Sequence, residues 1–259
     1  HAIDNLKERL ALIKVVPSKA TFDELTKMPV GSGPYKYDTI TDTTQDLSVN
    51  EHYNGSNPAT VSKIHYDNSR DATARLTAAV AGQTDVVEAL DPAGIEKVKA
   101  AGWEVKDATA YGIAMMTFNT TKAPFKDKRV RQALLTAIDT QTMIKTALNG
   151  AGKEPTSFLP DYNDQYKKAA TQFSFDVDKA KKLLADAGVA AGTEISVLTT
   201  TDTWIAAMGP QIKQNFEALG LKVNLNNVAS ADLWNNNVAQ GNFDVVVAPG
   251  DASVYGADP

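Results

Sequence analysis

The sequence contains no cysteine among its 259 residues and only three histidines. Without cysteine the chain has no disulfide, no thiolate metal ligand and no cysteine nucleophile. The histidines, His1, His52 and His65, have no histidine or glutamate partner at the spacings typical of metal ligands. The sequence therefore predicts neither a metal centre nor a cofactor.

The chain also lacks a run of basic residues and a long apolar segment. Its formal net charge is −5 at pH 7, so binding to nucleic acid or to an anionic membrane is not expected. No apolar run approaches the roughly 20 residues that span a bilayer, and the first residues, HAIDNLKERL, show no signal-peptide pattern. Either the protein is cytoplasmic or an export segment precedes these residues. The last residues, GADP, follow closely on an apolar strand, which favours a fragment of a longer chain.

Strand-like and helix-like segments alternate along most of the chain, which predicts an α/β protein. The apolar share of 43% and charged share of 22% are those of an ordinary globular chain. Helices are expected at residues 3–13, 71–83, 91–102, 127–138, 140–150, 176–188, 203–220 and 230–241. Strands are expected at residues 35–40, 45–50, 62–68, 85–90, 103–108, 112–120, 194–200, 221–228 and 243–250.

The stretch MPVGSGPYKY, residues 28–37, places two glycines beside two prolines and raises the question of a phosphate loop. A phosphate loop needs free backbone N–H groups and a helix directly after the glycines. Pro34 removes a donor, and Tyr35, Lys36 and Tyr37 follow with the two-residue period of a strand. The stretch therefore predicts a corner that begins a strand.

The sequence favours a binding protein over an enzyme. It contains no Gly-x-Ser-x-Gly elbow, and acidic pairs such as Asp23 and Glu24 fall on predicted surface. A Ser-His-acid triad is not excluded by sequence alone, so an α/β hydrolytic enzyme stays as the alternative.

The helix expected from residue 127 carries two arginines on its first turns. Asp127 is predicted to cap this helix, and Asp127 and Arg131 have the i, i+4 spacing at which opposite charges meet. Arg129 and Arg131 are therefore interpreted as surface and ion-pair residues in preference to ligand contacts. Asp176 is predicted to cap a later helix, and Gly150 and Gly188 to end helices.

Four motifs together resemble one family, the family 5 extracellular solute-binding proteins of ABC importers, which includes peptide- and nickel-binding receptors. The motifs are similar to that family in order and spacing along almost the whole chain. They are PVGSGPYKY (29–37), FNTTKAPFKDKRVRQALLTAID (118–139), DVDKAKKLLADAG (176–188) and GNFDVVVAPGDASVYGADP (241–259).

The resemblance implies a bilobal periplasmic-binding-protein-like fold (type II, cluster C) with an incomplete first lobe and a largely complete second lobe. Residues 1–119, with residues 245–259 returning, would belong to lobe I, and residues 120–244 to lobe II. The strands at 112–120 and 243–250 would be the hinge about which the lobes close on a ligand.

The resemblance also implies a set of ligand-binding residues. It places Met116, Phe118 and Asn119 on the first crossing strand, facing the cleft. It places Asp251, Ser253 and Tyr255 just after the second, where peptide receptors have an acid that pairs with the ligand amine and aromatic pocket walls. The segment PGDASVYGADP departs from the family's Gly-Trp-x-x-Asp-Tyr pattern, so Asp258 is the alternative acid.

A further contribution is expected from the start of the helix at residue 203. Thr201 or Asp202 is predicted to cap it, and its free N–H groups would suit an anionic end of a ligand, with Trp204 as a pocket wall. The alternative is a surface cap with a packed tryptophan. Trp103 and Trp234 are interpreted as packing residues.

The function implied by the resemblance is that of a monomeric receptor outside the cytoplasmic membrane, periplasmic or at the cell surface, with or without a lipid anchor in the complete protein. It would capture a small peptide or similar solute and deliver it to the permease subunits of an ABC importer. A solute sensor that signals through a partner protein would use the same closure and stays as a second alternative.

Overall fold

A computed structural model describes residues 16–69, 71–88, 90–106 and 112–251, the last residue by its backbone only. The helix expected at residues 3–13 and the predicted site residues Ser253 and Tyr255, with the alternative Asp258, lie outside the described residues. The chain divides into two compact units, residues 1–88 and 89–259. The lobe boundary after residue 119 refers to the lobes of a complete receptor and stays a prediction.

The first unit contains a three-stranded antiparallel sheet in the order β1-β2-β3. Strands β1 and β2 form the expected hairpin, in which Lys36 lies opposite Ser48. The turn is closed by polar groups, since the Thr41 backbone N–H donates to the Thr44 carbonyl at 2.9 Å. The elements of this unit are α2 (Phe22–Lys27), β1 (Tyr35–Ile40), β2 (Thr44–Val49), β3 (Lys63–Asp67) and α3 (Ala72–Val80).

Side chains of the first unit are only lightly buried. None of the residues in β1, β2 or β3 is fully buried, and within the described part of this unit Ala79 of α3 is the buried apolar residue. The strands are instead linked by polar side chains, such as Ser48 Oγ donating to Asp38 Oδ1 at 2.8 Å.

The second unit is built on a four-stranded sheet in the order β4-β7-β5-β6. Strand β5 pairs parallel with both β6 and β7, and β4 pairs antiparallel with β7 along its whole length. The strands are β4 (Gly112–Phe118), β5 (Glu194–Thr200), β6 (Lys222–Val228) and β7 (Val245–Asp251). The other elements are η1 (Pro92–Gly94), α4 (Ile95–Ala100), α5 (Lys128–Thr136), α6 (Thr140–Ala147), α7 (Val177–Asp186), α8 (Thr203–Glu217), α9 (Ser230–Asp232) and the π-helix η2 (Leu233–Val238).

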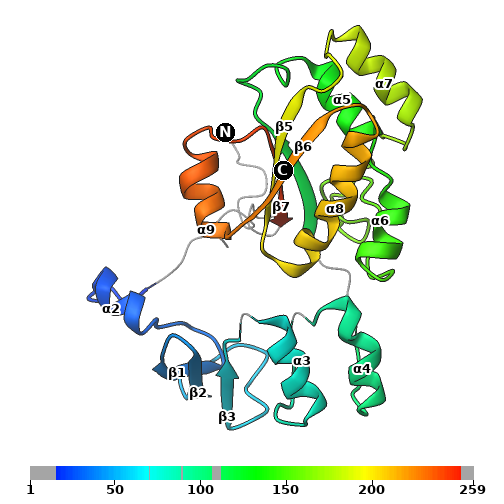
Figure 1. Cartoon of the computed structure of the whole chain (residues 1–259). Helices are drawn as coiled ribbons and strands as arrows, with labels where there is room; N and C mark the ends of the chain where they lie inside the picture. The colour runs from blue at the N-terminus through cyan, green and yellow to red at the C-terminus, as the bar shows by residue number, and fades with distance from the viewer. Residues whose placement is uncertain (1–15, 70, 89, 107–111, 252–259) are drawn as a thin grey trace. The chain divides into compact units, whose positions relative to one another are not determined.

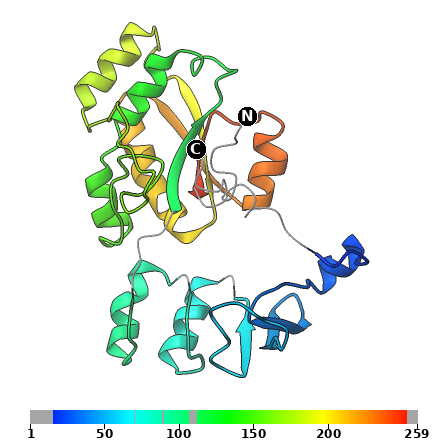
Figure 2. The same cartoon turned by 180° about the vertical axis from the view of Figure 1, so that it is seen from behind.

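Helices lie on both faces of this sheet (Figures 1 and 2). Helices α5 to α8 lie on one side of the strands and α9 on the other. A larger apolar cluster joins the first set of helices to the sheet, with Val197, Phe216 and Val245 in it. A smaller cluster on the opposite face contains Leu233 and Val246. Strands β5 and β7 are therefore buried on both faces, which explains the unbroken apolar run at residues 245–248 of β7 and the burial of both Val197 and Leu198 in β5.

The helix ends follow the signals in the sequence. The Asp127 carboxylate accepts a hydrogen bond from the Arg129 backbone N–H at 2.8 Å, and the Asp176 carboxylate one from the Lys179 N–H at 2.9 Å. Gly150 and Gly188 have φ values of 80° and 74°, a conformation in which glycine costs least at a helix end. These predicted caps and stops are confirmed.

The partner predicted for Asp127 is wrong. Its ion pair is with Arg129, whose Nε donates to Oδ2 at 3.0 Å. The Arg131 guanidinium turns back to the chain before the helix and donates to the Phe125 carbonyl at 2.6 Å. Hydrogen bonds from Arg129 hold the pKa of Asp127 at about 2. The carboxylate is already engaged at its own helix end, so the i, i+4 pair does not form.

Two of the predicted strands are also wrong. The described residues of 85–90 and of 103–108 are not strands. The described residues of these two stretches lie in the connections between α3 and η1 and between α4 and β4. The segment at residues 230–241 forms a short helical turn that continues as the π-helix η2.

Candidate ligand-binding site

The carboxyl ends of the three parallel strands of the larger sheet point to one edge, where β5 and β6 end side by side and β7 runs three residues further. Strands β5, β6 and β7 end at Thr200, Val228 and Asp251, and Gly112 at the start of β4 lies opposite Asp251. We call this the carboxyl edge. The main chain enters the sheet here through β4 and leaves it here through β7. Open α/β sheets bind ligands outside the carboxyl ends of their strands, where loops can present polar groups.

The amino end of helix α8 lies at the carboxyl edge, directly after β5. Asp202 occupies the N-cap position but its side chain makes no capping hydrogen bond. The first backbone hydrogen bond of the helix runs from the Ala206 N–H to the Asp202 carbonyl at 2.8 Å. Capping by the Asp202 side chain, one of the two predicted options, is therefore absent. The N–H groups before Ala206 have no partner within the helix and are suited to a carboxylate or carbonyl.

The charged side chains near this edge are acidic. Asp202 and Asp232 are exposed, and Asp251 ends β7. No lysine or arginine occurs in residues 198–206, in residues 226–236 or in residues 245–251. Carboxylates favour a ligand amine, whereas a helix amino end favours an anionic group. The edge therefore offers complementary groups to a molecule with both charges.

Three of the predicted site residues lie at the carboxyl edge. Thr201 is exposed between β5 and α8, and Asp251 is the last residue of β7. Trp204 lies in the first turn of α8, half-buried, and packs against the larger apolar cluster. This contact corresponds to the packed-tryptophan alternative, while its contact with a ligand stays a prediction.

The other three lie farther from this edge. Met116, in the middle of β4, packs half-buried against the larger cluster. Phe118 pairs with Val245 at the far end of the sheet, about 20 Å from Gly112 at the usual rise per strand residue. Its ring stacks on Phe125, with centroids 6.2 Å apart. These contacts are those of core residues, and a ligand role for them stays a prediction.

Asn119 connects two segments that are distant in sequence. It is 5% exposed. Its Nδ2 donates to the carbonyls of Gly241 and Phe243 at 3.2 and 3.1 Å, and its Oδ1 accepts from the Thr121 backbone N–H at 3.1 Å. Both ends of the amide are thus used within the protein, which fits a role in joining the end of β4 to the loop before β7.

Three residues near the carboxyl edge were not selected from the sequence: Met115, Thr200 and Gly250. They lie on the face of the sheet opposite α5 to α8. In a strand, successive side chains point to opposite faces. A prediction that places the ligand on the face of Met116 therefore leaves out Met115, which lies on the other face. The alternation in GIAMMTFN carries a signal for two faces, but it does not say which one meets the ligand.

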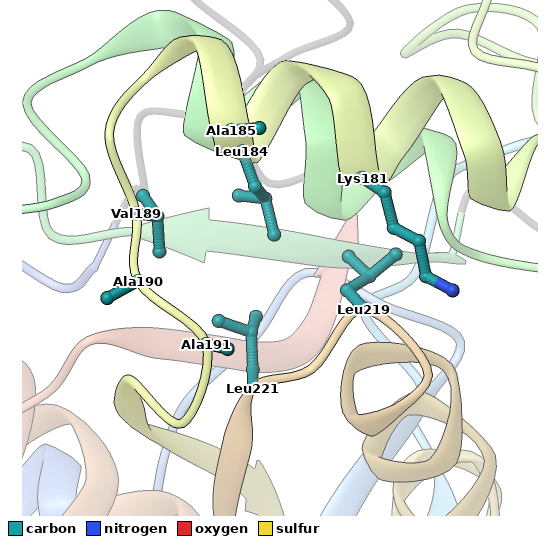
Figure 3. Close-up of a pocket in the computed structure, with 8 residues that line it drawn as sticks. All are labelled: Lys181, Leu184, Ala185, Val189, Ala190, Ala191, Leu219 and Leu221. Carbon is teal, nitrogen blue, oxygen red and sulfur yellow. The ribbon is translucent and has the colours of Figure 1, made fainter.

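An apolar pocket lies elsewhere, at the opposite end of the sheet (Figure 3). It has a volume of about 170 Å³, below the usual 300–1,000 Å³ of small-molecule sites. Figure 3 shows Leu184, Leu219 and Leu221 pointing toward one another, while the amine of Lys181 lies at one side. It is a packing gap between α7 and the segments that follow it.

The ionisable groups with shifted pKa values belong to structural contacts. Asp127 and Arg129 are at the start of α5. On β5 and β6, the Lys222 amine hydrogen-bonds Glu194 at 2.7 Å, which lowers the pKa of Glu194. Within the described residues, no group of three or more metal-ligating side chains is assembled.

Together, the sheet order, the flanking helices and the polar carboxyl edge define an α/β ligand-binding module. The family model for the middle part of the bacterial extracellular solute-binding proteins, family 5, matches residues 4–259. The chain belongs to this family.

Curated relatives include binding proteins named for different solutes. The chain is 32% identical over 186 residues to Heme-binding protein A of Haemophilus influenzae, which covers 71% of this chain and 32% of that protein. It is 27% identical over 176 residues to Di/tripeptide-binding protein 3 of Pseudomonas aeruginosa, covering 67% of this chain and 33% of that protein. The chain thus spans about a third of the length of these relatives.

Solved structures show the same fold. A dipeptide-binding protein from Pseudoalteromonas sp. SM9913, solved with Met-Leu, superposes with a TM-score of 0.76 at 24% identity, over 88% of this chain and 46% of that one. The oligopeptide-binding protein AppA of Bacillus subtilis, solved with a nonapeptide, gives a TM-score of 0.74 at 22% identity, over 87% and 48%. The predicted periplasmic-binding-protein fold is confirmed, with the chain covering part of it.

No helix in the described part of the chain has both the length and the apolar character that crossing a membrane requires.

Proposed function

We propose that this chain is part of the substrate-binding receptor of an ABC importer. The receptor captures a small peptide or similar solute between two lobes outside the cytoplasmic membrane and delivers it to the permease subunits. It acts as a monomer and without chemical change to the solute. The complete receptor lies in the periplasm or at the cell surface, with or without a lipid anchor, as the family description "extracellular" suggests.

The observation that carries this proposal is the pairing of β4 with β7. The two strands pair from Gly112–Asp251 to Phe118–Val245, and together they bring the chain into and out of the sheet at one edge. Two paired strands that pass through the same edge can flex together as a hinge. A ligand held at that edge would touch the residues that move.

Small peptides fit the chemistry of the carboxyl edge. A peptide carries an ammonium group at one end and a carboxylate at the other. Asp251 or Asp202 supplies a partner for the ammonium group, and the uncapped first turn of α8 supplies N–H groups for the carboxylate. Tyr255 and Ser253, which follow Asp251 in the chain, are proposed to complete the pocket, with Trp204 as a wall.

Isothermal calorimetry with dipeptides, such as Ala-Leu and its N-acetylated form, tests the proposal. The 259-residue chain and the complete protein that contains it are both titrated. We expect binding by the complete protein and a loss of about tenfold or more on N-acetylation, because desolvated charge pairs contribute strongly. Analysis of the recovered dipeptide by mass spectrometry is expected to find it intact, and cleavage would favour the hydrolytic alternative.

Variants identify the acid that binds the amine. Asp251→Asn and Asp202→Asn are compared with Asp178→Asn, an exposed carboxylate in the first turn of α7. The variant that removes the true partner binds Ala-Leu more weakly and no longer distinguishes it from the acetylated peptide. Equal affinities in all three variants, with acetylation still harmful, would exclude both acids as the partner.

A further inference from the structure

One row of side chains crosses the sheet just inside the carboxyl edge, on the face opposite helices α5 to α8. Met115 of β4 lies opposite Ala248 of β7, and Thr200 of β5 lies opposite Val228 of β6. Thr199 pairs with Val247, so Thr200 and Ala248, each one residue further along parallel strands, are neighbours. The row therefore runs across the sheet from Met115 to Val228 through small, buried side chains.

The side chain of Met115 lies over Gly250, the residue before the end of β7. A Cβ atom at Gly250 would lie 2.7 Å from the Met115 sulfur and 3.1 Å from its Cγ, closer than real contacts allow. The glycine thus leaves a space, and the tip of the methionine fills it. Methionine is unbranched and flexible, so this tip can move at low cost. Met115 is half-buried, and among the described residues it belongs to neither apolar cluster.

The hydroxyl group of Thr200 is unusual in this row. Thr200 is fully buried, and its Oγ1 has no hydrogen-bond partner among the residues that the structure describes. Its neighbour Thr199, on the other face, uses its own hydroxyl in a hydrogen bond to the Asn227 side chain. Buried polar groups in native proteins are nearly always paired. A ligand group that hydrogen-bonds to the Thr200 hydroxyl would supply the partner that the hydroxyl lacks beside the proposed binding edge.

We propose that Met115 covers a small side pocket of the ligand site, with Gly250 and Ala248 as its floor and the Thr200 hydroxyl as its polar end. When the methionine tip moves aside, the vacated space takes a hydroxymethyl group, which resembles the Sδ–Cε tip in length. The inference rests on the proposed function and names a solute class within it. The preferred ligands are small peptides with serine at the position that meets β4 and β7.

Dipeptide pairs that differ by one hydroxyl test the pocket directly. Ser-Gly is compared with Ala-Gly and Gly-Ser with Gly-Ala by calorimetry on the complete protein. One of the two pairs is expected to show a preference for serine of about 3- to 10-fold, the usual worth of one added hydrogen bond. The same titrations are repeated with Thr200→Val, which keeps the side-chain shape and removes the hydroxyl, and with Gly250→Ala, which fills the space with a methyl group.

Both variants are expected to reduce the serine preference to about one. Met143→Leu, a buried methionine substitution in α6, serves as the control and retains the preference. A melting curve for each variant shows that it folds. If Thr200→Val folds but keeps the same serine preference, or if neither original pair shows a preference, the side pocket is excluded. If the original protein binds none of the four dipeptides or Ala-Leu, the proposed function itself fails.

Discussion

The sheet of residues 112–251 and the sheet of residues 35–67 have strands of similar length but very different surroundings. In the larger sheet, Val197 and Val245 are fully buried under helices. In the smaller sheet no strand residue is fully buried, and Val49 and Tyr66 are exposed. The larger sheet is ordered mainly by tertiary packing. The smaller sheet is ordered mainly by its hairpin turn and by polar contacts between its strands.

This difference in packing affects how accurately each sheet can hold the side chains of a binding site. A site is held accurately when its side chains stand on elements locked by packing. The carboxyl edge belongs to such elements, because β5 and β7 have helices on both faces. The smaller sheet has local hydrogen bonds in place of a deep core among its described residues, so we expect it to open more readily.

The largest expected effect comes from the same substitution made in both units. Phe216→Ala removes a fully buried ring from the larger cluster and is expected to lower the free energy of unfolding by about 3–5 kcal/mol. Phe22→Ala acts on a ring that is 84% exposed and should change it by about 0.5 kcal/mol or less. Urea unfolding followed by tryptophan fluorescence measures the first variant, because all three tryptophans lie after residue 88.

The control for this comparison uses hydrogen exchange, which follows the first unit directly. Amides of β1 and β2 should exchange at the same rates with and without the Phe22 ring. Strong deprotection of these strands by Phe22→Ala would contradict the comparison, because it would show that the first unit depends on a core containing that ring.

A second pair concerns two asparagines that hold backbone carbonyls. Asn119→Asp places a buried carboxylate against the Gly241 and Phe243 carbonyls and should cost about 2–4 kcal/mol. Asn50→Asp acts in the smaller unit, where the half-buried Asn50 amide donates to the Gly33 carbonyl at 2.8 Å, and should cost about 1 kcal/mol or less because water can replace the bond. Denaturant titration measures the first and hydrogen exchange the second. If the two substitutions lowered the free energy of unfolding equally, the difference in burial between the two units would not explain their stability.

A smaller effect is expected at Asp127, in the larger unit. Hydrogen bonds from Arg129 lower its pKa from 3.8 to about 2. Because the folded pKa lies below the unfolded one, the stabilisation is present above about pH 4 and is lost as the pH falls toward 2. Asp127→Asn keeps a capping oxygen but no charge. The variant should therefore unfold at a lower urea concentration than the original at pH 7 and at the same concentration near pH 2. A difference that persists at pH 2 would contradict this cause.

The smallest effect is expected at His65, in the smaller sheet. Its Nδ1 hydrogen-bonds Asp46 at 2.6 Å, which raises the pKa of His65 above 6.5. A raised folded pKa stabilises the sheet fully below pH 6.5, and this contribution is lost as the pH rises through the folded value. Both groups are exposed, so the effect is weak. Hydrogen exchange of β2 and β3, corrected for intrinsic rates, should show less protection at pH 8.5 than at pH 6 in the original, and no such change in His65→Gln.

Much of the local structure was predictable because its causes are local. Asp127 and Asp176 cap helices whose first turns follow them directly, and Gly150 and Gly188 end helices because they adopt a positive φ easily. The corner at residues 28–37 leads into β1, as the two-residue period of Tyr35 to Tyr37 indicates. The two false strands, at residues 85–90 and 103–108, have strand-like local sequence, but their described residues pair with no strand, and pairing is not a local property.

The sequence named candidate site residues, but it did not show which of them lie close together. Thr201, Trp204 and Asp251 lie at the carboxyl edge, while Phe118 and Asn119 lie at the other end of the sheet. The resemblance to a receptor family predicts a ligand role for this strand but does not say how far along it the edge lies. That position depends on the register of β4 against β7, which is set by residues more than 100 positions apart.

The sequence alone determined the helices with strong caps, the hairpin, the α/β class and the family. The tertiary structure decided which strand face carries Met115 and which carries Met116, and which groups Asp127 and Asn119 contact. It also buried Thr200 with its hydroxyl unpaired among the described residues. The physical reason is the range of the forces involved. Capping and turn formation act within a few residues, whereas strand register and burial depend on how distant segments share one core.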